Sequence, residues 1–272
     1  MDNTLPGLDT LGMYINSLSA ASWPKFMYFF MLNKAGIALP DQTYAVETND
    51  GLKIIMRQNK LADMETFLEI FLGQPYFSRL PKGVRNKTKP TVLDIGAHIG
   101  LFSLYACSTL KMPKVYAYEP DMSNFNLMKE NIRANNLAGR IVPLNLAVGG
   151  TRGKVKLYTS KSSVSFSTVR AGNDARGREG YKLVTSTTMS EILKNVGHVD
   201  ILKMDSEGSE WGMIKEMRDR DFDVDYICME YHEVGGRKRG EMAEFLKKKG
   251  FEIELRDKDL GRGSGIIFAT KV

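Results

Sequence analysis

A short apolar strand, a glycine turn and an apolar helix follow one another in Thr91–Tyr105 (TVLDIGAHIGLFSLY), and this stretch constrains the fold most. Asp94 stands where the strand ends, and Gly96 and Gly100 bracket the turn. Glycine lets the backbone turn sharply and approach a ligand closely. The first N–H groups of the following helix have no partner within the helix. The stretch therefore predicts a loop that binds a nucleotide-type cofactor.

The spacing of Gly96 and Gly100, together with the acidic residue Glu119, indicates which class of cofactor the loop binds. A dinucleotide loop has G-x-G-x-x-G, whose close glycines fit a pyrophosphate, whereas Gly96 and Gly100 are separated by three residues. The Gly-Lys-Ser/Thr sequence of a P-loop is absent. Glu119 ends the next strand pattern, 25 residues after Asp94 (119 − 94). A carboxylate there is placed to accept hydrogen bonds from the two hydroxyls of a ribose.

Strand and helix patterns alternate from residue 90 onward. Apolar runs predict core strands at 114–119, 140–148, 199–204 and 224–229. A hairpin of 154–159 with 164–169, followed by an exposed loop at 170–180, interrupts the alternation. Strands at 251–255 and 265–269 end the chain with no helix between them, which predicts a final antiparallel pair. The pattern indicates an α/β fold with a mostly parallel sheet and helices on both faces.

The first 89 residues form a predicted N-terminal extension of helices and a β-hairpin, and residues 90–272 form the cofactor-binding domain. Residues 1–39 have apolar residues at helical spacing, with a break at Trp23-Pro24. Residues 43–58 predict a hairpin that turns at Asn49-Asp50-Gly51, and a short acidic helix at 63–71 precedes a basic link at 73–89. We expect the helices to be a cap, a lid over the substrate cleft or a homodimer contact.

Composition excludes several classes of protein. Cys107 and Cys228 fall in apolar patterns and are expected to be buried, because neither a disulfide framework nor a CxxC metal spacing is present. The N-terminus lacks the basic region of a signal peptide, and no apolar run is long enough to span a bilayer. A cytoplasmic protein without a transmembrane segment is expected. The net charge of +6 is compatible with an anionic partner but also with a mixed solvated surface.

Three motifs then carry a resemblance to known enzymes: VLDIGAHIG at 92–100, VYAYEP at 115–120 and LKMDSEGSEW at 202–211. They resemble the class I S-adenosylmethionine-dependent methyltransferases. Together with TNDGLKIIMR, ETFLEIF, NLAVG and MEYH, they resemble more closely the FkbM family, over about residues 43–270. The resemblance implies a Rossmann-like, seven-stranded mixed sheet whose last strand is antiparallel, and S-adenosyl-L-methionine as the cofactor.

The resemblance also implies roles for individual residues. The loop residues would surround the methionine part of the cofactor, Glu119 with Pro120 would bind the ribose, Ala147 would line the adenine, and Asp205 would face the methyl donor and its amino group. The cofactor-binding positions expected in this way are Asp94, Gly96, His98, Gly100, Glu119, Pro120, Ala147 and Asp205.

Methyl transfer needs a base that removes the proton of the acceptor, and strand ends offer three candidates. The candidate catalytic residues are His232, Glu230 and Asp205. His232 titrates near neutrality, but a histidine at a strand end can equally be a hydrogen-bonded structural residue. A divalent metal held by Asp205, Glu230 and His232 is an open alternative, although the second acid–Asn pair of metal-dependent catechol methyltransferases is missing. No metal is therefore assigned.

Other charged residues near these strand ends have structural interpretations. Lys203 lies within a core strand pattern and is expected to pair with a nearby acid. Glu207 is expected to hold the turn after the strand by accepting backbone N–H groups. Glu210 is favoured early in its helix because of the helix dipole.

Three functions remain in competition. The first is an O-methyltransferase acting on a hydroxyl of a small-molecule or glycan-type acceptor. The second is an RNA methyltransferase that contacts phosphates through the basic segments Arg79–Lys89 and Arg170–Arg178. Against it, the DSEG sequence at 205–208 differs from the Asn/Asp-Pro-Pro-aromatic motif of amino-group methylases. The third is a cofactor-binding subunit without catalytic activity.

Overall fold

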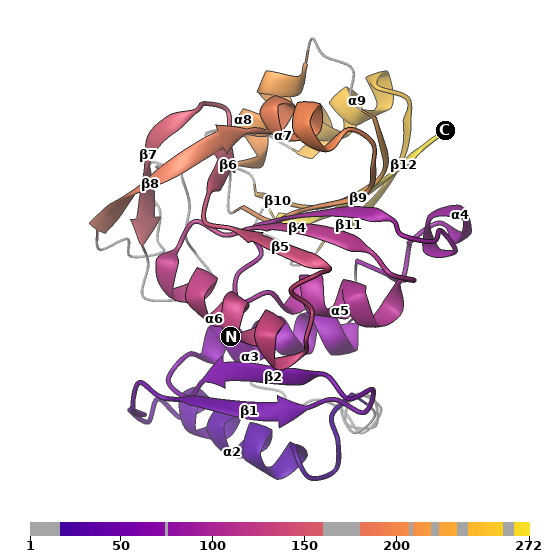
Figure 1. Cartoon of the computed structure of the whole chain (residues 1–272). Helices are drawn as coiled ribbons and strands as arrows, with labels where there is room; N and C mark the ends of the chain where they lie inside the picture. The colour runs from indigo at the N-terminus through magenta and orange to yellow at the C-terminus, as the bar shows by residue number, and fades with distance from the viewer. Residues whose placement is uncertain are drawn as a thin grey trace.

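A seven-stranded mixed sheet forms the centre of the protein, as the family resemblance implies (Figure 1). The computed structural model describes residues 17–73, 76–159, 180–206, 209–218, 223–232, 239–257 and 264–272. The strands are β3 (Thr91–Ile95), β4 (Lys114–Tyr118), β5 (Ile141–Leu144), β9 (Val199–Met204), β10 (Val224–His232), β11 (Phe251–Asp257) and β12 (Ser264–Lys271). Their order is β11-β12-β10-β9-β3-β4-β5, and β12 runs antiparallel to both of its neighbours.

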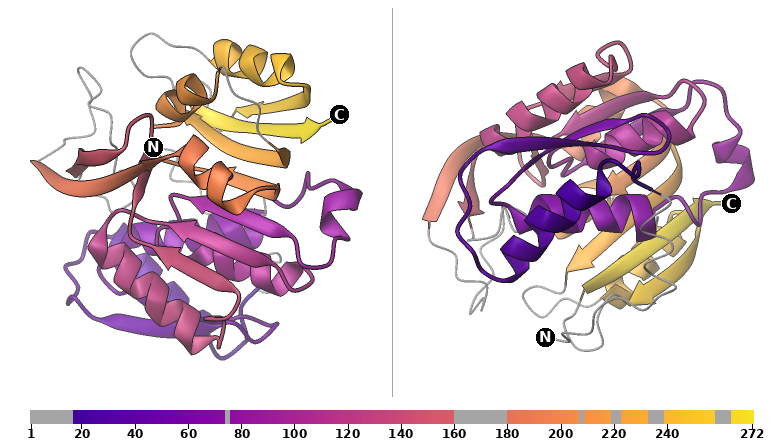
Figure 2. Two further views of the ribbon diagram at one scale, coloured as in Figure 1. Left: turned by 45° about the horizontal axis from the view of Figure 1, so that its top comes forward. Right: turned by 90° about the horizontal axis from the view of Figure 1, so that it is seen from below.

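Helices cover both faces of this sheet (Figures 1 and 2). One face carries α5 (Leu101–Thr109) and α6 (Met122–Ala134), and the other carries α7 (Met189–Val196), α8 (Glu210–Met217) and α9 (Arg239–Lys248). Successive strand residues point to opposite faces, so Val92 packs with the α5–α6 side and Leu93 with the α7–α9 side. Cys107 and Cys228 are buried and unpaired with each other, as expected from their apolar surroundings.

The N-terminal extension lies against the α5–α6 face of the sheet (Figure 1). Its elements are α2 (Trp23–Lys34), β1 (Thr43–Glu47), β2 (Lys53–Arg57), α3 (Leu61–Leu68), a π-helical turn η1 (Glu69–Gly73) and α4 (Lys82–Arg85). The predicted hairpin is confirmed, because β1 and β2 pair antiparallel. Pro24 stands in the first turn of α2, also as the sequence indicates. The first sixteen residues lie outside the described ranges.

Two kinds of contact fasten this extension to the sheet domain. Phe26 and Phe67 share one buried apolar cluster with Phe102 of α5. Asn131 of α6 and Asn135, the C-cap of that helix, accept hydrogen bonds from the backbone of β2, at the N–H groups of residues 55 (2.7 Å) and 53 (2.8 Å). The asparagines thereby satisfy the outer edge of a strand that would otherwise be exposed. The boundary at residue 90 stays a prediction.

The single strand predicted at 140–148 is wrong, because the structure divides this segment between two sheets. β5 ends at Leu144, whereas β6 (Ala147–Gly149) joins a three-stranded sheet of order β6-β8-β7. Asn145 lies between them, and its side-chain amide donates to the carbonyl oxygens of Glu119 (2.9 Å) and Pro120 (3.1 Å). Since these bonds hold the chain beside the end of β4, the segment turns out of the central sheet.

The smaller sheet differs from the predicted hairpin. β7 (Gly153–Thr159) pairs along its whole length with β8 (Gly180–Thr188), a segment that includes the end of the predicted loop. The predicted partner strand at 164–169 and most of the predicted loop lie outside the described residues. The β7–β8 ribbon extends beyond the body of the protein (Figure 1).

Candidate active site

A cavity lies at the carboxyl ends of the central strands, around the point where the strand order reverses at β3. It encloses ≈ 1010 Å³ of empty space, counting the part that opens to solvent. The predicted site residues that line it are Gly96, His98, Glu119, Pro120, Ala147, Asp205 and Glu230. Asp94, Gly100 and His232 lie behind this lining.

The glycine loop has the backbone that its sequence predicts. Gly96 (φ 76°) and Gly100 (φ 87°) are both in the left-handed region, and Gly100 is the N-cap of α5. A Cβ at Gly96 would lie 1.8 Å from the carbonyl oxygen of Asp205. The backbone N–H of Asp205 donates to the carbonyl of Ile95 at 3.0 Å. Gly96 is therefore required because the ends of β3 and β9 meet at this point.

Asp94 supports the loop from below through a buried ion pair. The carboxylate is fully buried, accepts a hydrogen bond from the Ser103 hydroxyl (2.7 Å), and lies 3.4 Å from Nζ of Lys203. Lys203 Nζ also donates to the carbonyl of Gly96 at 2.8 Å. Burial opposes the charge of Lys203, but Asp94 and Asp205 together raise its pKa above the usual value. The predicted pairing of Lys203 with a nearby acid is confirmed.

Glu119 presents a buried carboxyl group to the cavity. One oxygen accepts the backbone N–H of His98 (2.8 Å), and the other accepts the backbone N–H of Asp121 (2.8 Å). The side-chain amide of Asn124 reaches the second oxygen at 3.4 Å. Burial raises the pKa of Glu119 to about 8, although the N–H donors favour the charged form. Its place between the glycine loop and Pro120 fits a group that accepts hydrogen bonds from hydroxyls.

His98 connects the glycine loop to the N-terminal hairpin. Its Nε2 lies 3.4 Å from Oδ1 of Asp63 and 3.5 Å from Nη2 of Arg57. Burial lowers the pKa of His98 to about 4, with Asp63 acting in the opposite direction, so the ring is neutral at pH 7. Arg57 and Asp63 form a buried ion pair (2.6 Å), and Arg57 also donates to the amide oxygen of Asn124 (2.9 Å).

The far side of the cavity from β9 and β10 is apolar. Leu146, Ala147 and Val148 line it directly after β5, and Leu157 of β7 adds a further apolar side chain. An apolar wall next to Glu119 fits a flat heterocycle attached to a ribose. The split of the predicted 140–148 strand creates this wall, because it carries Ala147 away from the central sheet and over the cavity.

The turn after β9 places Asp205 in the cavity. Ser206 is held by Glu210, whose Oε1 accepts the Ser206 backbone N–H (2.7 Å) and hydroxyl (3.0 Å). Glu210 therefore does more than favour the helix dipole, since it fixes the turn. Glu207, to which the sequence assigned this role, lies outside the described residues.

Glu230 and His232 lie at the end of β10 with different exposure to the cavity. Glu230 lines it, whereas His232 is 6% exposed and lies behind Glu230, with Nε2 3.6 Å from Oε1 of Glu230. His232 Nδ1 is 3.8 Å from Glu210, and the indole of Trp211 donates to the His232 carbonyl (2.8 Å). His232 thus has buried contacts with two acids.

Sequence reasoning missed the wall that the N-terminal extension contributes. Thr66, Glu69, Ile70 and Tyr76 all line the cavity opposite the strand ends. Glu69 and Ile70 stand in the ETFLEIF stretch, whose resemblance to the FkbM family was a usable signal. Tyr76 lies in the segment 73–89, which the sequence indicates only as a basic, turn-rich link. No sequence pattern there marks Tyr76 as a cavity residue.

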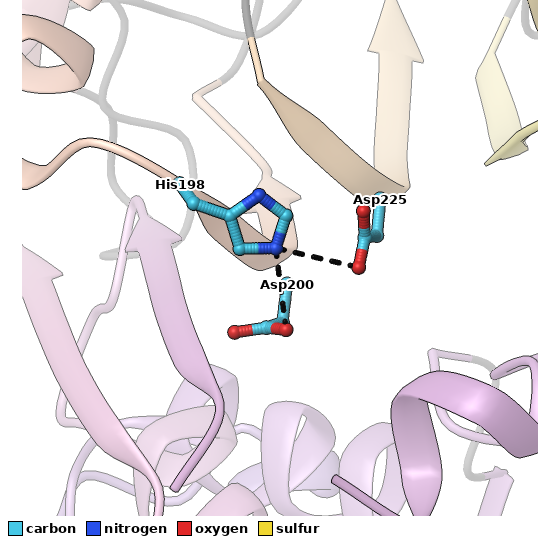
Figure 3. Close-up of side chains that lie close together, drawn as sticks. All are labelled: His198, Asp200 and Asp225. Atoms are coloured by element: carbon cyan, nitrogen blue, oxygen red, sulfur yellow. Dashed lines mark ion pairs between the residues drawn. The ribbon is translucent and has the colours of Figure 1, made fainter.

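A second cluster of ionisable side chains is shown in Figure 3, and none of its members lines the cavity. His198, Asp200 and Asp225 form the one group in the described ranges with three metal-type ligand atoms within 4.8 Å of one another; Asp205, Glu230 and His232 do not form such a group. Nζ of Lys87 lies 2.5 Å from Asp200 and 2.8 Å from Asp225. Hydrogen bonds to both acids raise the pKa of Lys87, so its ammonium group already balances their charge.

A comparison with solved structures agrees with this fold. The METTL16 MTase domain (crystal form 2) has a TM-score of 0.50 and 14% identity over 94% of this chain and 98% of its own. The sheet order and its antiparallel β12 are those of the class I, Rossmann-like methyltransferases, so the predicted fold class is confirmed. No helix in the described ranges combines the length and apolarity needed to cross a membrane.

The family follows from the sequence match. The family described as "Methyltransferase FkbM domain" matches residues 94–253, more than half of the chain, and the chain belongs to this family of methyltransferases. The 31-O-demethyl-FK506 methyltransferase FkbM of Streptomyces tacrolimicus is 24% identical over 229 residues, 74% of this chain and 86% of that protein. The hexuronic acid methyltransferase AglP of Haloferax volcanii is 23% identical over 141 residues, 51% of this chain and 54% of that protein.

Proposed function

We propose that this protein is an S-adenosylmethionine-dependent O-methyltransferase acting on a hydroxyl of a small-molecule or glycan-type acceptor. The observation that carries the proposal is Glu119, a buried carboxyl that faces the cavity beside a glycine loop in a chain of the FkbM family. The names of two relatives support a natural product or a sugar-type molecule as the kind of acceptor, and one of them names an oxygen atom as the methylated position.

The residues around the cavity fit the cofactor part by part. Glu119 is placed to accept the ribose hydroxyls, and the wall at Leu146–Val148 fits the adenine. Asp205 would bind the amino group, and the loop at Gly96 would lie along the methionine part. When bound, the cofactor supplies a methyl group already activated by a positively charged sulfur. The protein therefore needs mainly to align the acceptor and remove its proton.

Glu230 is the proposed base because it is the carboxylate at the end of β10 that lines the cavity. Glu230 would take the proton of the acceptor hydroxyl as that oxygen accepts the methyl group, which the cofactor would supply while its sulfur keeps the electron pair. His232 then acts through Glu230, because its Nε2 lies 3.6 Å from that carboxylate and the ring is behind the lining. Asp205 remains an alternative base on the same wall.

Binding and turnover experiments test the proposal separately. Glu119→Ala should weaken S-adenosylhomocysteine binding by roughly 1–3 kcal/mol in calorimetry, through loss of the hydrogen bonds that its carboxyl group accepts from the ribose. Glu230→Gln should lower the release of S-adenosylhomocysteine with a hydroxyl acceptor while leaving cofactor affinity within twofold. Unchanged affinity in the first variant, or an unchanged rate in the second, would contradict the role assigned to that residue.

The basic segment that suggested RNA makes contacts within the protein. Arg79 pairs with Glu254 (2.9 Å), Arg85 donates to the carbonyl of Phe77 (2.6 Å), and Lys87 is held by two acids. Because these cations have internal partners, the described part of the segment gives less support to a phosphate-binding surface than its sequence does. The loop Arg170–Arg178 lies outside the described residues.

A further inference from the structure

One wall of the cavity has no role in the proposed cofactor binding. Thr66 of α3, Glu69 and Ile70 of η1, and Tyr76 after it face the ends of β9 and β10 across this space. All four precede residues 94–253, which match the family. The wall includes a π-helical turn, a feature that often occurs at functional sites because it displaces side chains from their regular helical positions.

Tyr76 and Glu69 form a polar unit on this wall. Tyr76 is 3% exposed, its ring lies edge-on to Phe102 with 5.6 Å between centroids, and its hydroxyl donates to Oε1 of Glu69 at 3.3 Å. Burial, and then the negative charges of Glu69, Asp205 and Glu230, raise the pKa of Tyr76 well above its usual value. Glu69 of the extension and Asp205 and Glu230 at the strand ends therefore all lie close enough to the Tyr76 hydroxyl to influence it electrostatically.

The charge of this part of the cavity restricts what it can bind. Among the described residues that line the cavity, Lys203 is the one Lys or Arg, and its ammonium group is held by Gly96 and Asp94. Carboxylates accept hydrogen bonds from hydroxyl groups, whereas Glu69 and Glu230 would repel a phosphate or carboxylate on the acceptor.

We propose that Glu69, Tyr76 and Glu230 form the acceptor subsite, and that this subsite takes an uncharged, hydroxyl-rich acceptor of the sugar or polyol type. Glu69 binds a hydroxyl next to the one that is methylated, and Glu230 contacts the reacting hydroxyl. The proposal rests on the O-methyl transfer proposed above and adds that the N-terminal extension selects the acceptor.

The test uses the full chain and three matched sets of probes: methyl hexopyranosides, the corresponding uronic acids and the corresponding 6-phosphates. Binding is measured by saturation-transfer NMR in the presence of S-adenosylhomocysteine, and turnover by S-adenosylhomocysteine release. We expect binding of neutral glycosides, at least tenfold weaker binding of both charged sets, and at least a tenfold loss of kcat/KM for the neutral set in Glu69→Gln. Glu65→Gln is the matched control, since Glu65 is in the same helical segment but pairs with Lys34 in solvent.

Cofactor affinity separates a subsite effect from misfolding, because Glu69→Gln should bind S-adenosylhomocysteine as the wild type does. The proposal is overturned if neutral glycosides do not bind, if charged probes bind as tightly, or if Glu69→Gln behaves like Glu65→Gln. Binding of neutral glycosides that is lost in Glu69→Gln, without any methyl transfer, would support the subsite and contradict the proposed O-methyltransferase activity.

Discussion

The buried Arg57–Asp63 ion pair should hold both the N-terminal hairpin and the cofactor loop in place. Asp63 is fully buried and accepts three hydrogen bonds from Arg57, at the backbone N (3.0 Å), Nε (2.8 Å) and Nη2 (2.6 Å). The same guanidinium group donates to Asn124, which contacts Glu119. A change in the pair is thus expected to reach the proposed ribose site through one intervening side chain.

The magnitude follows from the burial of both partners. The side chains of Arg57 and Asp63 are 8% and 0% exposed, so removing one partner leaves a charge without solvent or a counter-ion. Such losses are typically about 3–5 kcal/mol, against a total stability of about 5–15 kcal/mol for a domain. Arg57→Leu and Asp63→Leu should each have this effect. The double variant should lose less than the sum of the two, because no buried charge remains.

Urea unfolding followed by circular dichroism measures this cycle, and calorimetry with S-adenosylhomocysteine measures its effect on the site. At a temperature where Asp63→Asn is folded, its cofactor affinity should be about tenfold lower, or about 1.4 kcal/mol. Lys34→Ala is the control, since the Lys34–Glu65 pair is half exposed and worth about 0–1 kcal/mol. If Arg57→Leu and Asp63→Leu are as stable as Lys34→Ala, the reasoning is refuted.

Three further predictions concern the loop. Burial raises the pKa of Glu119 to about 8, so the carboxyl group loses its proton between pH 7 and pH 9. Adenosine, which has the ribose hydroxyls but no amino-acid part, should therefore bind more tightly as the pH rises over this range. Calorimetry on Glu119→Gln should show no such trend. The lowered pKa of His98, about 4, means that the unfolded chain takes up a proton first as pH falls below 6.5. The unfolding free energy of the wild type should therefore fall by about 2 kcal/mol by pH 5, and that of His98→Asn should not show this fall. Urea titrations at both pH values measure the two proteins, and an equal fall in both would count against the prediction. Gly96→Ala should lower Tm by several degrees because of the contact with Asp205, whereas Gly139→Ala, with no atom within 4 Å, should not.

The parts of the site that depend on local pattern were predictable. The glycine turn, the strand that leads to Glu119 and the final antiparallel pair each depend on residues close in sequence. The pairing of Lys203 with an acid was predictable for another reason, because a lysine inside a core strand needs a partner even when that partner, Asp94, is distant in sequence. The family match confirms the resemblance on which the cofactor assignment was built.

The parts that depend on distant contacts were not predictable. The break of the 140–148 segment comes from the bonds of Asn145 to Glu119 and Pro120, about 25 residues away. An asparagine within an apolar run gives no sign of such partners. Likewise, the sequence shows Arg57 and Asp63 only as a hairpin end and an acidic helix residue, because their third partner, His98, is 41 residues from Arg57.

The shared apolar cluster has a consequence for how acceptor preference can change during evolution. Tyr76 faces the cavity, yet its ring packs on Phe102, and Phe77 beside it packs on the same ring at 5.3 Å. A mutation that reshapes the acceptor wall must also preserve the packing that fastens the extension to α5. New acceptor specificities should therefore arise through paired substitutions at Tyr76 and Phe102. These two positions should covary among relatives that methylate different acceptors.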